Sequence, residues 1–338
     1  MLSRLITFDR QCREAIELSR ATPVPIEAEA ISNIVVSGLG GSAIGGDLLR
    51  VYLDNRLNIP IFINRDYALP TYVSHSSLLF VVSYSGNTEE TLSVFNAAFK
   101  GSIPMVCITS GGLLYDWAVE KKRCVVQIPT GYPPRTALGF LFIPMLMVLT
   151  IVGLLEDLEA ELEETIALLR RKAAEYHPTV PTDKNKAKQL SAHLHDLIPI
   201  LYASERFYPV AQRWRTQIEE NAEGFAHSNV FPELHHNEIM GWQGLRQFGN
   251  VFTTILFRDK GDMPQIQKRM EISRQLLESD GLSITEVWSE GDFLLTRLFS
   301  LICLGDFVSF YAAILKGLDP TPVDRIECLK KQLKDMEA

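Results

Sequence analysis

Two short stretches combine glycine with hydroxyl side chains, a pattern typical of loops that hold phosphate. The first, Gly38–Asp47, reads GLGGSAIGGD and follows the apolar run NIVVS. The second, SYSGNTEET, places Ser83, Ser85 and Thr88 within six residues, beside a glycine and an asparagine. Glycine and asparagine permit left-handed turns that point backbone amides inward, and amides at a helix N-terminus attract anions. The pattern predicts a phosphate cup of hydroxyl groups and amides, with Thr88 as the N-cap of a helix that begins at Glu89.

The glycine loop alone leaves several interpretations open. Gly38 to Ala43 also satisfies the G-x-G-x-x-G/A pattern of dinucleotide-binding loops, for which Asp66 stands somewhat late as the acidic partner. A plain tight turn fits as well, whereas a Walker loop is excluded because no Gly-Lys-Ser/Thr follows. The second hydroxyl-rich loop favours a sugar monophosphate with a doubly charged head, because a dinucleotide site does not need such a loop.

Carboxylate and imidazole groups later in the chain could move protons. The helical stretch QIEENAEG carries Glu219, Glu220 and Glu223, and PELHHNEIMGW carries the adjacent pair His235 and His236. The simplest interpretation of the glutamates is a solvated helix face. We do not interpret the histidines as zinc ligands, because adjacent histidines point in different directions and no H-E-x-x-H spacing is present. We expect neither a metal nor a cofactor.

The composition fits an ordinary globular protein with two domains. The chain has 338 residues, 46% of them hydrophobic, and a formal net charge of −8, which argues against nucleic acid and anionic membranes as partners. Its five cysteines form no C-x-x-C pair, which favours reduced thiols and a cytoplasmic location. The early charges of Asp9 and Glu14 argue against a signal peptide.

One uncharged run, residues 138–155, is eighteen residues long and reaches the length threshold for a membrane span. Gly139, Pro144 and Gly153 interrupt this run, and no basic cluster marks a cytoplasmic side. We therefore expect a helix buried in the core or at a subunit interface, and no membrane partner.

Strands and helices alternate along the chain, which predicts βαβ units and parallel sheets covered by helices on both faces. The fold class expected is α/β, with two domains of similar architecture and a C-terminal helix. We expect the first domain at residues 1–155, a charged helical linker at 156–190 and the second domain at 191–338. The expected strands lie at 33–40, 59–66, 77–86, 104–112, 124–129, 198–204, 251–259 and 282–291. The expected helices include 1–20, 89–100, 209–224 and 265–280.

The two glycine- and hydroxyl-rich loops together resemble the sugar isomerase (SIS) domain, an α/β module that binds phosphosugars. Three later stretches, PPRTALGFLF, QIEENAEGFAHSNVFPELHHNEIMGW and IECLKKQL, are similar to the bifunctional phosphoglucose/phosphomannose isomerases, which contain two such domains. The resemblance covers nearly the whole chain. It implies an enzyme that interconverts glucose 6-phosphate, and mannose 6-phosphate, with fructose 6-phosphate through a cis-enediol. The family's usual Q-x-N-E-N-A-K stands here as Gln217 to Glu223, with two changes toward acid.

The resemblance also implies a role for each candidate residue. Glu220, the Glu of Glu-Asn-Ala, would carry the proton between C2 and C1 as the base, and Arg135 would stabilise the charge of the enediolate. His236 would open the sugar ring, reaching the site from the partner subunit of a homodimer. Lys330 would assist at the ring oxygen, with Lys331 as the alternative.

The remaining implied residues bind the substrate, a sugar 6-phosphate. Thr321, in the stretch DPTPV, would line the region near the reacting carbons and leave room for both epimers. A non-catalytic phosphosugar sensor of the same fold is the alternative function, although such regulators often carry a DNA-binding domain and the chain has no basic helix-turn-helix segment. A dinucleotide-dependent enzyme is the third function considered.

The phosphate ligands that the resemblance implies are Gly41, Ser42, Ser83, Ser85 and Thr88.

Overall fold

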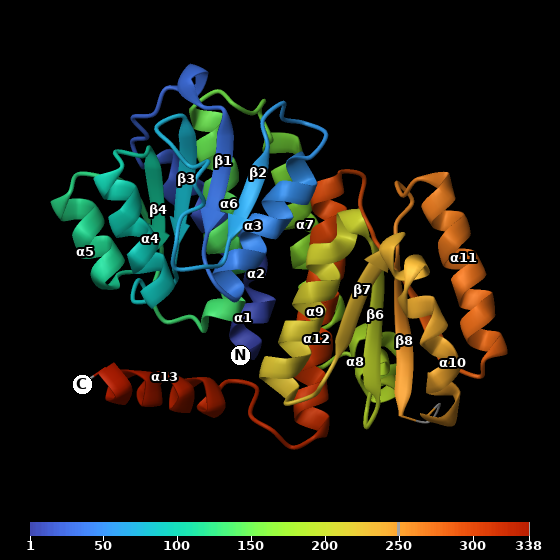
Figure 1. The fold of residues 1–338 in the computed structure, drawn as a ribbon. Helices are drawn as coiled ribbons and strands as arrows, with labels where there is room; N and C mark the ends of the chain where they lie inside the picture. Colours follow the sequence, from blue (N-terminus) through green and yellow to red (C-terminus); the bar gives the residue numbers. More distant parts are fainter. Residues whose placement is uncertain (249–250, 338) are drawn as a thin grey trace.

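The computed structural model describes residues 1–248 and 251–337 and contains two separate parallel sheets (Figure 1). The first sheet has five strands in the order β2-β1-β3-β4-β5, and the second has four in the order β7-β6-β8-β9. Every strand pair in both sheets is parallel. The expected α/β class, with two sheets flanked by helices and a C-terminal helix, is confirmed.

Strands and helices alternate along most of the chain. Those of the first half are α1 Leu2–Ile6, α2 Phe8–Arg20, β1 Asn33–Ser37, α3 Gly41–Leu53, β2 Ile61–Asn64, β3 Ser77–Val82, α4 Glu89–Lys100, β4 Met105–Thr109, α5 Gly112–Glu120, β5 Cys124–Gln127, the short 3-10 helix η2 Pro134–Thr136, and α6 Leu138–Ile151. Those that follow are α7 Glu159–Glu175, α8 Lys186–His193, β6 Ile198–Ser204, α9 Tyr208–Ala222, β7 His227–Phe231, the 3-10 helices η5 Glu233–His236 and η6 Glu238–Met240, α10 Trp242–Leu245, β8 Phe252–Arg258, α11 Pro264–Ser279, β9 Ser283–Trp288, α12 Leu294–Leu315 and α13 Asp324–Glu337.

Both faces of each sheet are covered. Along β3, which is buried throughout, Leu78 and Phe80 join one hydrophobic cluster and Leu79 and Val81 join another. This alternation follows from the two-residue period of a strand. It explains why strands of the first sheet show continuous apolar runs in the sequence.

A single hydrophobic core joins the two halves. The cluster that contains Phe80 of the first sheet also contains Phe257 of the second. Helices α6 and α7 both pack against α2, and α7 packs as well against α12, which in turn packs against α9. Figure 1 shows α7, α9 and α12 between the two sheets, with α6 behind the first sheet. The helical region at 156–190 therefore contributes packing surface to the inter-sheet core through α7.

The two most apolar helices lie inside this core. The uncharged run forms α6, which is buried over nearly its whole length, as expected. Among the described residues, α12 is the one helix long and apolar enough to span a membrane by length and composition, and 83% of its apolar window is buried within the protein. Both helices are core helices of the fold.

Two elements differ from the sequence-based expectation. The N-terminal helix is broken at Thr7 into α1 and α2, because Thr7 leaves the helical conformation with φ −111° and ψ 19°. The strand β7, His227–Phe231, was not predicted, because its sequence HSNVF is mostly polar and lacks the apolar run of the other strands. It forms an edge of the second sheet, where polar residues are tolerated.

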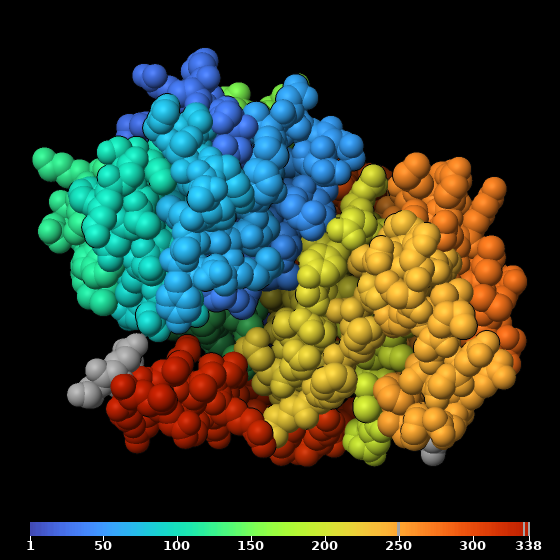
Figure 2. All heavy atoms as spheres, in the orientation of Figure 1, coloured from blue at the N-terminus to red at the C-terminus, as the bar shows by residue number. Residues whose placement is uncertain are grey.

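The C-terminal helix α13 projects from the body of the molecule. It leaves the end of α12 and runs beneath the first half (Figure 1), and its described side chains are exposed. In the space-filling view a hollow separates α13 from the surface of the first half above it (Figure 2).

Candidate active site

The glycine loop at the start of α3 approaches the neighbouring strand and loop closely. A side chain at Gly38 would lie 2.8 Å from the carbonyl oxygen of Val82, and Gly40 has a positive φ of 52°. Ser42, in the first turn of α3, is buried, and its hydroxyl accepts a hydrogen bond of 3.4 Å from the backbone N–H of Tyr84. Because β1 and β3 are adjacent in the sheet, the two predicted loops meet at its carboxyl edge.

The second loop, after β3, is closed by its own hydroxyl groups. The Ser83 and Thr88 hydroxyls share a hydrogen bond of 2.9 Å, and Ser83 Oγ accepts the N–H of Gly86 at 3.1 Å. Ser85 is exposed, and its hydroxyl accepts the N–H of Asn87 at 3.2 Å. Thr88 occupies the N-cap position of α4, but the expected side-chain cap is wrong because its hydroxyl pairs with Ser83 instead.

Arg135 lies directly against the glycine loop. A side chain at Gly41 would stand 3.1 Å from the carbonyl oxygen of Pro134 and 3.3 Å from the Cα of Arg135. The two consecutive prolines before Arg135 restrict the backbone that presents it. The hydroxyl-rich loops and Arg135 therefore belong to one region of the molecule, at the carboxyl edge of the first sheet.

The side chain of Arg135 crosses from the first half to the second. It is buried, and its Nε donates to the side-chain oxygen of Asn221 on α9 at 2.6 Å. Its Nη2 donates to the carbonyl oxygens of Pro320 and Thr321 at 2.7 and 2.9 Å. Thr321, proposed from the sequence to lie near the reacting carbons, is thus next to Arg135. Sequence reasoning missed Asn221 and these carbonyl acceptors.

Glu220, near the C-terminal end of α9, faces the same guanidinium. Its Oε2 lies 3.7 Å from Arg135 Nη1, and 28% of its side chain is exposed. Among the described residues no hydrogen bond is made to the Glu220 carboxylate. A carboxylate that is largely buried, accepts no hydrogen bond from the described residues and is ion-paired with Arg135 is suited to accept a proton from a bound ligand.

Burial is the largest influence on the pKa of Glu220, and it raises the pKa above the ordinary value. The charges of Arg135 and Arg213 act in the opposite direction, the carboxylate of Glu219 raises the pKa further, and the ammonium of Lys330 lowers it. Because the net direction is upward, Glu220 takes up a proton at a higher pH than an exposed glutamate does. This places its titration closer to neutral pH, where a general base works best.

The rival carboxylates on α9 lie in different surroundings. Glu223 is exposed and ends the helix in a left-handed conformation, with φ 47° and ψ 37°. Glu219 is partly buried, and burial raises its pKa as well. Arg213, Gln217 and Glu220 follow the i, i+4, i+7 spacing that shares one helix face, and this face meets Arg135.

Lys330 lies on α13 and is exposed. Its charge lowers the pKa of Glu220 and so favours the ionised carboxylate. The structure thus brings together the two hydroxyl-rich loops, Arg135 and Glu220, and the charge of Lys330 acts on the Glu220 carboxylate.

His236 is separated from this group by the second sheet. Helix α9 packs on the face of that sheet whose residues include Leu201, whereas the η5 turn packs through Leu234 on the face that includes Tyr202. Figure 1 shows α9 and α10 on opposite sides of the sheet. His236 is exposed, and among the described residues its ring makes no hydrogen bond.

Its neighbour His235 is engaged within the chain. The Nε2 atom of His235 shares a hydrogen bond of 2.7 Å with Ser273 Oγ, and Arg269 Nη1 donates to Nδ1 at 3.0 Å. Burial and the nearby Arg269 charge lower the pKa of His235. Among the described residues no group of three or more His, Cys, Asp or Glu side chains is arranged to hold a metal ion.

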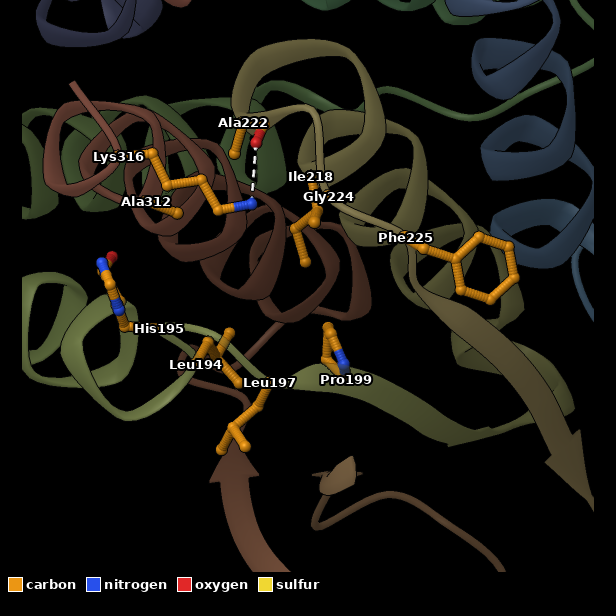
Figure 3. A pocket seen from close by; sticks show the side chains of 11 residues that line it. Leu194, His195, Leu197, Pro199, Ile218, Ala222, Gly224, Phe225, Ala312 and Lys316 are labelled. Atoms are coloured by element: carbon orange, nitrogen blue, oxygen red, sulfur yellow. Dashed lines mark hydrogen bonds between the residues drawn. The ribbon is translucent and has the colours of Figure 1, made fainter. Parts of the chain in front are cut away.

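A small cavity lies beside the C-terminal end of α9, the helix that carries Glu220. Ile218, Ala222 and Lys316 help to line it (Figure 3), and its volume of about 30 Å³ leaves space for roughly one or two water molecules. The Lys316 ammonium donates to the carbonyl oxygen of Ala222 at 3.0 Å, which satisfies a terminal carbonyl of the helix. The cavity is too small for a sugar phosphate.

Comparison with known proteins shows what the chain is similar to. The family model for the bacterial phospho-glucose isomerase C-terminal SIS domain matches residues 183–333. The chain is 40% identical over 338 residues to a bifunctional phosphoglucose/phosphomannose isomerase from Caldicellulosiruptor bescii, covering 100% of both chains. It is 37% identical over 306 residues to the protein of the same name from Aquifex aeolicus, covering 89% of this chain and 90% of the relative.

A solved structure shows the same fold at low sequence identity. The C-terminal domain of glucosamine-fructose-6-phosphate aminotransferase from Francisella tularensis is similar with a TM-score of 0.68 and 16% identity. The match covers 96% of this chain and 97% of that one. At this identity the likeness concerns the fold alone.

The two loops predict how inorganic phosphate binds. We expect the double variant Ser85→Ala/Thr88→Ala to raise the Kd for inorganic phosphate, because a hydrogen bond to a charged group contributes about 1.5–3 kcal/mol. Each lost bond then weakens binding about tenfold or more. Isothermal titration calorimetry measures this directly. Ser93→Ala, at an exposed position on α4, is the control and should leave Kd unchanged; an unchanged Kd in the double variant would place the phosphate elsewhere.

Proposed function

The chain belongs to the bifunctional phosphoglucose/phosphomannose isomerase family, and on this premise we propose that it interconverts glucose 6-phosphate and mannose 6-phosphate with fructose 6-phosphate. Both aldoses lose the proton at C2 to give the same cis-enediol. The reaction needs a base for that proton and a group that stabilises the negative charge on the oxygens. It transfers no electrons to a second molecule.

The observation that carries the proposal is the pairing of Glu220 with Arg135 beside the phosphate loops. Glu220 removes the proton from C2 and returns it to C1, so that one carboxylate acts as base and then as acid. Arg135 stabilises the enediolate oxygens, and its burial in a site shielded from water strengthens that interaction. Lys330, from α13, assists at the ring oxygen. Ser42 and the loop Ser83–Thr88 hold the phosphate.

We further propose that the active form is a homodimer in which His236 reaches the Glu220 of the partner. Two observations support this. His236 is exposed on the outer face of the second sheet, where it is free to enter a neighbouring site. Helix α13 also exposes an apolar stripe at i, i+3, i+7 and i+10 spacing, which a second copy would cover. The stripe consists of Ile326, Leu329, Leu333 and Met336, each between 40% and 85% exposed.

A cytosolic location completes the proposal. The five cysteines are all free thiols in the structure, which suits a reducing compartment. Cys12, Cys107 and Cys303 are buried, and burial raises the pKa of each thiol well above its ordinary value. These three thiols therefore stay protonated and unreactive, and they serve as packing groups in the core.

We predict that Glu220→Gln lowers kcat by at least about 10²–10⁴ while substrate still binds, because the amide cannot accept the proton and the phosphate loops are untouched. In the wild type, kcat/KM should fall as the pH is lowered through the raised pKa of Glu220, since the reaction needs the ionised carboxylate. A coupled assay of fructose 6-phosphate formation across pH measures both effects.

Glu219→Gln is the matched control on the same helix. It should retain turnover, and the acidic limb of its pH profile should move to lower pH, because the charge that raises the pKa of Glu220 has been removed. Wild-type turnover in Glu220→Gln would contradict the assignment of the base.

The dimer proposal predicts complementation. Glu220→Gln and His236→Ala should each be impaired, whereas a coexpressed 1:1 mixture should recover up to about one quarter of wild-type activity, since half the dimers are mixed and each contains one intact site. Mixing Glu220→Gln with a chain that carries both substitutions is the control, and it should recover nothing. Isolated mixed dimers without recovered activity would show that His236 does not cross the interface.

A further inference from the structure

Helix α12 buries a carboxylate in otherwise apolar surroundings. Asp306 lies near the middle of this helix and is 4% exposed, and its neighbours Gly305 and Phe307 pack into the core. Removing an ionised carboxylate from water is costly unless it is paired and hydrogen-bonded. The burial of Asp306 in the core between the two halves therefore requires partners for its carboxylate.

Three donors from α9 surround Asp306. Arg213 forms a two-point ion pair with it, with Nε donating to Oδ1 at 3.0 Å and Nη2 donating to Oδ2 at 2.8 Å. Gln217, one turn further along, donates to Oδ1 at 2.8 Å. Arg213 and Asp306 are only 3% and 5% exposed by side chain. The carboxylate thus fixes the face of α9 that also carries Glu220.

Two residues of α9, Arg213 and Asn221, hold Arg135 at two points. Arg213 Nη2 donates to the backbone carbonyl oxygen of Arg135 at 2.8 Å. Asn221 accepts the Nε of Arg135 and donates its own Nδ2 to the hydroxyl of Ser309 on α12 at 3.0 Å. The backbone and the guanidinium of Arg135, which belongs to the first half, are therefore both tied to α12 through α9.

We propose that Asp306 is a positioning residue, which sets the place of Arg135 relative to Glu220 through Arg213 and is not required for the stability of the core. This inference rests on the proposed roles of Glu220 and Arg135. A buried ion pair can often be replaced by apolar residues of similar volume at no cost in stability. Its value here is geometric, because catalysis is lost steeply when a reacting group moves by about 1 Å.

The decisive variant is Arg213→Met/Asp306→Leu, which removes both charges together and leaves neither unpaired. We expect the melting temperature to stay close to that of the wild type, the Kd for inorganic phosphate to be unchanged, and kcat to fall about 100-fold. If the Arg213–Asp306 pair had only a structural role, kcat would stay at the wild-type value whenever the variant folds with native stability. That result would overturn the proposal.

The pH dependence of kcat/KM gives a second test, because a purely structural role of the pair would leave it unchanged. The charged groups that influence Glu220 are Arg135 from the η2 turn, Arg213 and Glu219 from α9, and Lys330 from α13. Loss of the Arg213 charge and a less firmly held Arg135 guanidinium each raise the pKa of Glu220. The acidic limb of kcat/KM should therefore move to higher pH in the double variant, and an unmoved limb would count against the proposal.

Two further variants keep the test decisive. Ser309→Ala removes the hydroxyl that accepts from Asn221 and donates to the backbone oxygen of Asp306. Because this change removes no charge, the variant should fold even if the double variant does not, and it should lower kcat several-fold without changing phosphate affinity; wild-type kcat would contradict the proposal. Arg13→Gln/Glu163→Gln, which removes an exposed two-point pair between α2 and α7, is the control and should leave kcat unchanged. The failure of the proposed function is distinguishable, because it would show as activity in Glu220→Gln.

Discussion

A buried guanidinium has to find acceptors for its N–H groups, and the acceptors of Arg135 are all in the other half of the molecule. The first half supplies the arginine and the two hydroxyl-rich loops, while Asn221 and the carbonyl oxygens of Pro320 and Thr321 come from the second. Leaving these donors unpaired in the core would cost several kcal/mol. The site is therefore complete only when the two sheets pack on the shared helical core.

The electrostatics of the site follow from the same packing. Burial raises the pKa of Glu220, and the charges of Arg135, Arg213 and Lys330 lower it. Burial also lowers the pKa of Arg135, against the influence of Glu220. The outcome is a carboxylate that accepts a proton at a higher pH than an exposed glutamate does, beside a cation that in the proposed reaction shares its charge with the enediolate. Asp306 is ion-paired with Arg213 beneath this pair, and the charge of Arg213 lowers the pKa of Glu220 together with that of Arg135.

Local sequence patterns predicted much of the fold and part of the site. Apolar runs located eight of the nine strands among the described residues, and glycine and hydroxyl spacing drew attention to the two loops that meet at the edge of the first sheet, because these features depend on neighbours in the chain. Strand β7 was missed because its residues are polar and it lies at a sheet edge. The Thr88 hydroxyl was expected to cap α4, and its pairing with Ser83 depends on the loop conformation. The contact of Arg135 with Thr321 spans 186 positions, a distance at which a single sequence carries no pairing signal.

The central claim is that one site, built around Glu220, serves both aldose phosphates. The most direct measurement follows the conversion of [1-13C]glucose 6-phosphate by NMR while unlabelled mannose 6-phosphate is added. If a single base serves both epimers, mannose 6-phosphate inhibits competitively, with an inhibition constant near its own KM, and Glu220→Gln removes both activities together. Mannose 6-phosphate that neither reacts nor competes, or that reacts without affecting glucose 6-phosphate turnover, would contradict the single shared site.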